Sequence, residues 1–200
     1  MSLDTPSLAL RSLLQTTALK SGLRRGPSGN PLSITGLTPT AQLFAASVFA
    51  SEAPVILIVP ADRDIERLAA DGRFFLGALS GFAESEANRR ILPFPSYEVD
   101  PYREIEPHLD VTAARGRTLA ALAQRRARLV IASAAAVLPR LSPPGRMLEA
   151  IIDLRPSGTM SPTELIDQLM QIGFSRADPV DSHGQFGSRG GIVDIFPAGD

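Results

Sequence analysis

The stretch PVILIVP at residues 54–60 decides the fold, because it is an uninterrupted apolar run between two prolines. A continuous run, unlike an alternating one, is typical of a strand covered on both faces, as in a parallel sheet. RLVIA at residues 128–132 repeats the pattern, and residues 32–35 and 90–94 are shorter candidates. We therefore expect four strands in one parallel sheet.

Helical patterns separate these candidate strands. Thr38 is a good N-cap and Pro39 suits the first helical position, so a helix is expected to begin there. Asp62 and Asp110 are candidate N-caps of the next two long helices. The expected helices span residues 38–51, 62–79, 110–126 and 133–138. The alternating order predicts the α/β class, with right-handed crossovers.

The pattern changes at LSPPGR, residues 141–146, which is the best candidate for a domain boundary. Beyond it a helix is expected over residues 161–172, because Ser161 and Glu164 have the spacing of a capping box. Strands are expected at residues 147–154, 174–180, 184–187 and 190–196. We therefore predict a smaller α+β domain after the α/β domain.

Three segments follow from this pattern. Leucines spread over residues 5–23 predict an amphipathic helix, so residues 1–29 are expected to be an N-terminal helix and linker. Residues 30–142 would form the α/β domain, and residues 146–200 the start of the α+β domain. The apolar run 192–196 is followed by a turn signal, which predicts that this chain is part of a longer protein.

Composition excludes several kinds of chemistry. The chain has no cysteine and two histidines, so disulfides, thiolate metal sites and HExxH metal sites are excluded. Of the 20 basic residues the single lysine is Lys20, and no glycine precedes it, so no P-loop is present. We expect no catalytic residue, no metal and no cofactor. A net charge of −1 and the lack of a long apolar run or signal peptide predict a cytoplasmic protein that avoids membranes.

Charge is unevenly distributed along the chain. Residues 84–110 hold seven acids and three arginines, whereas residues 111–150 hold seven arginines and one acid. Two interpretations remain open: a solvated helix face beside an acidic loop, or a contact surface for a protein or a nucleic-acid backbone. Arginines at 115, 117, 125, 126 and 128 could contact phosphates. We expect DNA binding to be weak and salt-sensitive at most.

Two glycine-containing stretches are candidate sites. SITGLTPTA, residues 33–41, sits where a P-loop would sit but lacks its lysine and second glycine. We expect this stretch to be a plain strand-to-helix turn. The residues at the P-loop position, which would form a degenerate nucleotide site, are Thr35, Gly36, Thr38 and Thr40. GQFGSRGG, residues 184–191, is expected to form a hairpin whose glycines permit positive φ.

Arg189, at the tip of that hairpin, has two interpretations. It could be an interface anchor, because a guanidinium on a rigid hairpin suits a partner's carboxylate. Alternatively, it could pair with an acid of its own domain, such as Asp178 or Asp194. His108 and His183 are expected to be surface or capping residues.

Three stretches together resemble the N-terminal region of bacterial transcription-repair coupling factors, which is itself similar to the damage-recognition subunit UvrB. The first runs from Phe94 to Leu119 and includes FPSYE and the dipeptide Pro107-His108. The second is LVIAS at 129–133, with Leu138 and Pro143. The third, the most specific, contains GFSR at 173–176, HGQF at 183–186 and SRGGIVDIFP at 188–197. The resemblance covers residues 30–200.

The resemblance implies a non-catalytic module with a degenerate P-loop, RecA-like domain and an inserted domain that binds UvrA. By this resemblance Arg189, Gly190 and Phe186 form the UvrA-binding site, and further contacts fall after residue 200. It also implies an ATP-dependent DNA translocase in the full-length protein, whose later domains would contact RNA polymerase and DNA. The alternative is a fragment of a UvrB-like ATP-dependent repair helicase, which the missing lysine disfavours. A third alternative is an α/β domain with an unrelated ligand.

Overall fold

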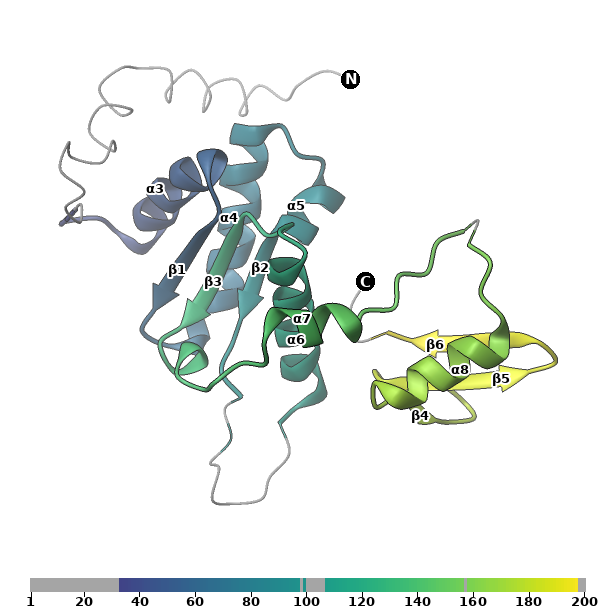
Figure 1. Cartoon of the computed structure of the whole chain (residues 1–200). Helices are drawn as coiled ribbons and strands as arrows, with labels where there is room; N and C mark the ends of the chain where they lie inside the picture. Colours follow the sequence, from purple (N-terminus) through teal and green to yellow (C-terminus); the bar gives the residue numbers. More distant parts are fainter. Residues whose placement is uncertain (1–32, 98, 100–106, 157, 198–200) are drawn as a thin grey trace.

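The computed structural model describes residues 33–97, 99, 107–156 and 158–197, and these form two small sheets with their helices (Figure 1). The predicted helix over 5–23 and most acids of the loop after Tyr97 lie outside the described residues. The first group of elements, here the parallel-sheet unit, comprises α3 (Pro39–Glu52), β1 (Val55–Val59), η1 (Asp62–Asp64), α4 (Ile65–Ser80), α5 (Glu84–Arg90), β2 (Ile91–Phe94), α6 (Leu109–Ala123), β3 (Leu129–Ser133), η2 (Ala135–Val137) and α7 (Pro144–Glu149). The second, here the hairpin unit, comprises α8 (Pro162–Gln171), β4 (Ser175–Arg176), β5 (Gln185–Arg189) and β6 (Ile192–Phe196).

The first sheet has the order β1-β3-β2, and both neighbouring pairs are parallel. Alternate side chains of β3 point to opposite faces, so its continuous apolar sequence requires cover on both sides. Leu129 and Ile131 pack against α3 and α4, whereas Val130 and Ala132 pack on the α6 side. The predicted α/β class with a parallel sheet is therefore confirmed, as a three-stranded sheet with helices on both faces.

Strand β1 departs from the prediction that both of its faces are covered. It lies at the edge of the sheet, with β3 as its partner. Val59 is buried on the α3–α4 side, but Ile56 and Ile58 are each 56% exposed on the other face. Their partners across the pair, Val130 and Ala132, are buried, so among the described residues α6 covers the centre of the sheet and does not cover this face of β1.

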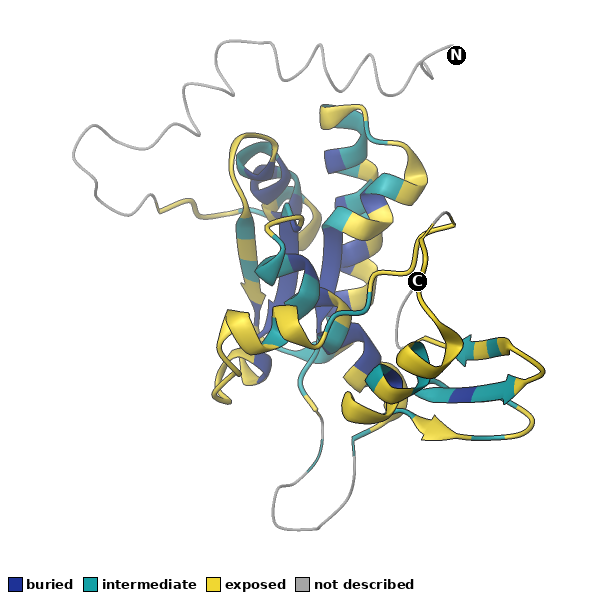
Figure 2. Ribbon diagram, turned by 45° about the vertical axis from the view of Figure 1, so that its right-hand side comes forward, coloured by how far each residue is buried: buried dark blue, intermediate teal, exposed yellow. Residues whose placement is uncertain are grey.

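The hairpin unit packs α8 on a sheet of order β4-β5-β6, in which β4 and β5 are parallel and β5 and β6 antiparallel. Ser161 caps α8, and its hydroxyl accepts a hydrogen bond from the Glu164 N–H at 3.1 Å, as the capping box predicts. The buried apolar side chains of this unit are Leu169 and Phe186. Its core is therefore small, and most side chains of β4 to β6 are at least partly exposed (Figure 2).

Several predicted elements are wrong. The described residues 33–35 are not a strand, and the single helix expected over 62–79 is divided into η1 and α4. The strand expected over 147–154 is replaced by α7 and irregular chain. Pro143 and Pro144 explain this change, because their fixed φ suits the first turn of a helix and Pro144 occupies a first-turn position.

The segment expected as a strand over 174–180 contributes a two-residue strand, β4. After it the chain turns through Asp178 and Pro179, which are joined by a cis peptide bond. The strand expected over 184–187 extends to Arg189 as β5, and the last expected strand is confirmed as β6. The hairpin is therefore longer than the sequence suggested, and Arg189 ends a strand.

Candidate partner-binding surface

The tip of the hairpin is a two-residue turn made by Gly190 and Gly191. Arg189 and Ile192 are opposite each other in the β5–β6 pair, and the φ angles of the two glycines are 56° and 89°. Two consecutive positive φ angles are typical of a type I′ turn, which suits the twist of the flanking strands. The predicted glycine hairpin is thus confirmed, and it fixes the backbone of Arg189 at the end of a paired strand.

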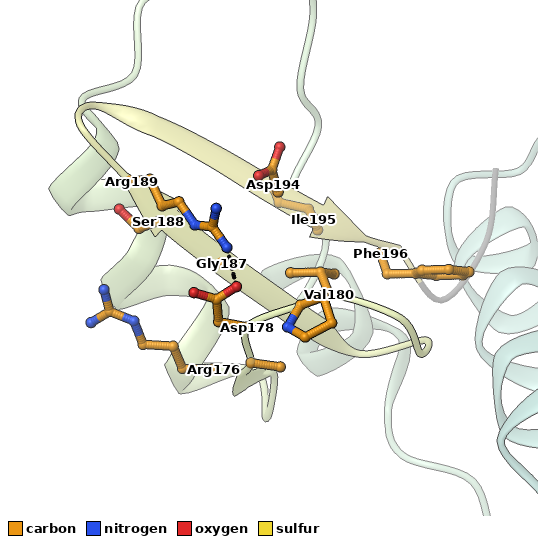
Figure 3. Close-up of a pocket in the computed structure, with 11 residues that line it drawn as sticks. Arg176, Asp178, Val180, Gly187, Ser188, Arg189, Asp194, Ile195 and Phe196 are labelled. Carbon is orange, nitrogen blue, oxygen red and sulfur yellow. Dashed lines mark hydrogen bonds and ion pairs between the residues drawn. The ribbon is translucent and has the colours of Figure 1, made fainter.

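Arg189 projects over an open hollow of about 650 Å³ in this unit (Figure 3). The end of β4, the turn after it, and strands β5 and β6 line the hollow. Its guanidinium Nη2 donates a hydrogen bond to Asp178 Oδ1, and the two groups form an ion pair. The Arg189 side chain is still 73% exposed and the Asp178 side chain 66% exposed. An exposed arginine held in this way is accessible to a carboxylate of another molecule.

Gly187 brings the turn after β4 against the face of β5. A Cβ atom added to Gly187 would lie 3.0 Å from Val180 Cγ2 and 3.1 Å from the Ala177 carbonyl oxygen. The Ala177 N–H also donates to the Phe186 carbonyl oxygen at 2.9 Å. The absence of a side chain at Gly187 therefore permits the close packing that places Asp178 beside Arg189.

Phe186 and Gly190 complete the residues that the resemblance assigned to the partner surface. Gly190 lies in the exposed turn next to Arg189. Phe186, in contrast, is fully buried, and it lies opposite Ile195 in the β5–β6 pair. The Phe186 side chain is therefore not available for direct contact with a partner.

The degenerate nucleotide site has a different arrangement. Gly36 has a positive φ of 78°, and Thr35, Thr38 and Thr40 are exposed before or at the start of α3. The Thr38 hydroxyl accepts a hydrogen bond from the Ala41 N–H at 3.4 Å, and Pro39 stands in the first helical turn. The predicted cap is confirmed. One backbone N–H group at the start of α3 is therefore bonded to the side chain of Thr38.

A polar cluster that sequence reasoning missed lies at the carboxyl ends of the three parallel strands. Asp62 follows β1, and its carboxylate accepts hydrogen bonds from the Ser96 N–H and hydroxyl, both at 2.7 Å, after β2. Ser133 ends β3 at the same edge of the sheet. Partial burial raises the pKa of the Asp62 carboxyl. The serine bonds and the charge of Arg115 outweigh that effect and hold the pKa below its ordinary value.

Arg115 of α6 lies inside the protein instead of facing a phosphate backbone. It is 1% exposed, and its guanidinium donates to the Pro95 carbonyl oxygen at 2.6 Å and to the Ala136 carbonyl oxygen at 3.4 Å. The guanidinium carbon lies 4.1 Å from the ring centroids of both Phe94 and Tyr97. The expectation that Arg115 could contact phosphates is therefore wrong.

Other predicted cations and caps are also reassigned. Arg128 donates to the Ser51 carbonyl oxygen at 2.8 Å, so it joins the loop before β3 to the end of α3. Asp62 does not cap α4, whose N-cap is Asp64. His108 rather than Asp110 is the N-cap of α6, and its Nδ1 accepts a hydrogen bond from the Asp110 N–H at 3.3 Å.

His183 links the two units loosely. Its Nδ1 lies 2.6 Å from the Pro197 carbonyl oxygen, and its ring contacts Phe196 edge-on with centroids 4.5 Å apart. Its Nε2 lies 3.8 Å from Asp110 Oδ1, at the start of α6. Both histidines thus occupy the surface positions expected of them. Among the described residues no group of three histidine or acidic side chains is arranged to hold a metal ion.

The sequence of this chain matches a family model and several known proteins. A family described as the UvrB interaction domain matches residues 152–200, which contain the hairpin unit. Over 96% of its length the chain is 28% identical to the transcription-repair-coupling factors of Mycobacterium bovis and Mycobacterium tuberculosis. Over 73% of its length it is 25% identical to that of Escherichia coli. The chain spans 15% of the length of the mycobacterial relatives and 12% of the Escherichia coli relative.

These matches support the resemblance to transcription-repair coupling factors. Residues 152–200 match the UvrB interaction domain family, and the chain is similar, over most of its length and in several species, to transcription-repair-coupling factors. None of the helices within the described ranges is both long and apolar enough to cross a membrane.

Proposed function

We propose that this chain is the N-terminal part of a transcription-repair coupling factor, and that its hairpin unit recruits UvrA to stalled RNA polymerase during nucleotide-excision repair. The observation that carries the proposal is the agreement between the UvrB interaction domain match and an exposed arginine on a rigid hairpin. An arginine anchor of this kind can contribute much of an interface's binding free energy.

The parallel-sheet unit has a supporting role in this proposal. Its glycine turn carries no lysine, and Thr38 and Pro39 occupy the start of α3. The chain itself is therefore proposed to be non-catalytic. Translocation on DNA driven by ATP, and contact with RNA polymerase, belong to the regions of a full-length coupling factor that follow residue 200.

The test compares UvrA binding by Arg189→Ala and by the unsubstituted protein, both in the full-length chain. Removal of a central arginine anchor should weaken binding by about 2 kcal/mol or more, which is roughly thirtyfold in Kd. The melting temperature should change little, because the Arg189–Asp178 pair is exposed and stabilises the fold by about 0–1 kcal/mol.

Arg117→Ala is the matched control, since Arg117 is an exposed arginine of α6 and its removal changes the net charge equally. Its UvrA affinity should equal that of the unsubstituted protein. Earlier melting of Arg189→Ala with unchanged UvrA binding would mean that the arginine is structural and that the proposed site is wrong.

A further inference from the structure

The hollow beneath the hairpin holds two cations and two anions. Arg176 ends β4, Arg189 ends β5, Asp178 lies in the turn after β4, and Asp194 lies on β6. Among these four the ion pair that forms joins Arg189 and Asp178 (Figure 3). Asp194 lines the same hollow and carries the same charge. The two carboxylates therefore differ in that Asp178 contacts the Arg189 guanidinium and Asp194 does not form this ion pair.

Backbone packing keeps Asp178 beside Arg189. The Ser175 and Ala177 N–H groups donate to the Gly184 and Phe186 carbonyl oxygens, each at 2.9 Å. Gly187 lets the same turn lie directly against β5. The Asp178 carboxylate is thus presented to the arginine by the fold, so it remains nearby whether or not the ion pair is closed.

The pair is too exposed to be explained by stability. Ion pairs between exposed side chains stabilise proteins by about 0–1 kcal/mol, and salt weakens them further. A guanidinium binds best to one carboxylate that accepts two parallel hydrogen bonds. A second carboxylate brought to Arg189 must either displace Asp178 or approach a like charge, and both cost binding free energy.

We propose that Asp178 is an intramolecular competitor that occupies Arg189 in the free protein and lowers its affinity for an acidic partner. This inference rests on the proposed function, because the partner that brings the carboxylate is taken to be UvrA. Asp178 then sets how strongly the hairpin holds UvrA, and prevents tight binding to any acidic surface that cannot displace it.

The experiment measures UvrA binding by full-length Asp178→Asn and Asp194→Asn. Both substitutions remove one negative charge from the hollow, and the asparagine preserves the shape of the side chain. Asp178→Asn should bind UvrA about fivefold more tightly, the factor that corresponds to losing an exposed ion pair of roughly 1 kcal/mol. Asp194→Asn should change Kd less than twofold. Unchanged or weaker binding by Asp178→Asn, or an equal gain in Asp194→Asn, would overturn the proposal.

A double variant tests whether Asp178 acts through the arginine. In an Arg189→Ala background, Asp178→Asn should have no further effect on Kd, because the competing carboxylate has lost the group it competes for. A gain that persists there would contradict the competitor role. If Arg189→Ala alone binds UvrA normally, the proposed function fails, and this outcome is distinct from failure of the competitor.

A measurement without UvrA keeps the competitor testable in that case. The Arg189 side-chain N–H signal can be followed by NMR during titration with acetate, which supplies a free carboxylate. In Asp178→Asn the signal should shift at a severalfold lower acetate concentration than in the unsubstituted protein, whereas Asp194→Asn should follow the unsubstituted curve. Superimposed curves for Asp178→Asn and the unsubstituted protein would refute competition at Arg189.

Discussion

Replacement of Arg115 by methionine should destabilise the parallel-sheet unit by about 3 kcal/mol. The substitution keeps a long, unbranched side chain at this position and removes the guanidinium that contacts the rings of Phe94 and Tyr97. The carbonyl oxygens of Pro95 and Ala136 then lose their donor inside the protein. The effect should therefore come from hydrogen bonding and electrostatics, with little change in packing volume.

The magnitude follows from these contacts. The 2.6 Å bond to Pro95 is a charged hydrogen bond, worth about 1.5–3 kcal/mol, and the longer bond to Ala136 belongs at the low end. Cation–π contact with a desolvated arginine adds about 2 kcal/mol. The loss of stability is smaller than the total of these contributions, because the substitution also removes the cost of desolvating the buried guanidinium. The net loss of about 3 kcal/mol is large against the roughly 5–15 kcal/mol that stabilises a typical domain.

Urea unfolding followed by circular dichroism measures this loss. Arg117→Met is the matched control, because Arg117 is exposed on the same helix and should shift the free energy of unfolding by no more than about 0.5 kcal/mol. The reasoning is refuted if Arg115→Met and Arg117→Met unfold at the same urea concentration. In that case the buried arginine would contribute no more than a surface one.

Three further outcomes are expected. Asp62→Asn should lower the free energy of unfolding at pH 7 by about 1 kcal/mol, since the site is only partly buried. Because the pKa of the Asp62 carboxyl is lowered in the folded protein, this difference in stability should be complete above the ordinary pKa of 3.8 and should vanish as the pH falls through the lower folded pKa. Acid titration of both proteins measures it. Gly187→Ala should lower the free energy of unfolding by roughly 1–3 kcal/mol, and therefore the melting temperature, because its Cβ would press on Val180. The control Gly116→Ala should be neutral or stabilising, because an added Cβ meets open space in α6. Calorimetry should detect no saturable binding of micromolar ATP, since no lysine follows the glycine turn before α3, and a measurable micromolar Kd would contradict the degenerate site.

Local rules explain the part of the fold that the sequence predicted correctly. The caps Thr38 and Ser161 depend on residues within three positions of themselves, and the structure shows both. The Gly190-Gly191 turn likewise depends on backbone freedom at two adjacent residues. The three apolar strands were predicted from their continuous apolar sequences, which are typical of parallel sheets, although the Ile56 and Ile58 side chains of β1 are exposed.

The features that were missed depend on which segments meet. Exposure of Ile56 and Ile58 follows from the edge position of β1, and strand order is not encoded in the strand itself. In the sequence Arg115 looks like any other helical arginine. Its burial depends on tertiary contacts with the end of β2 and with η2, which the local sequence does not show. The Arg189–Asp178 pair was one of the two alternatives left open, and it could not be selected before the turn after β4 was placed against β5.

The strand order also determines when this protein can fold during its synthesis. Of the three strands of the parallel sheet, the central strand β3 is synthesised last. Strands β1 and β2 each pair with β3 rather than with each other. At roughly 5–20 residues per second, the ribosome needs several seconds to extend the chain from Val59 to Leu129. Throughout that interval the strand that pairs with β1 in the described part of the chain has not been made, so the apolar sequence of β1 is available to chaperones and vulnerable to aggregation. Synthesis of β3 completes the sheet and gives the backbone of β1 its partner strand.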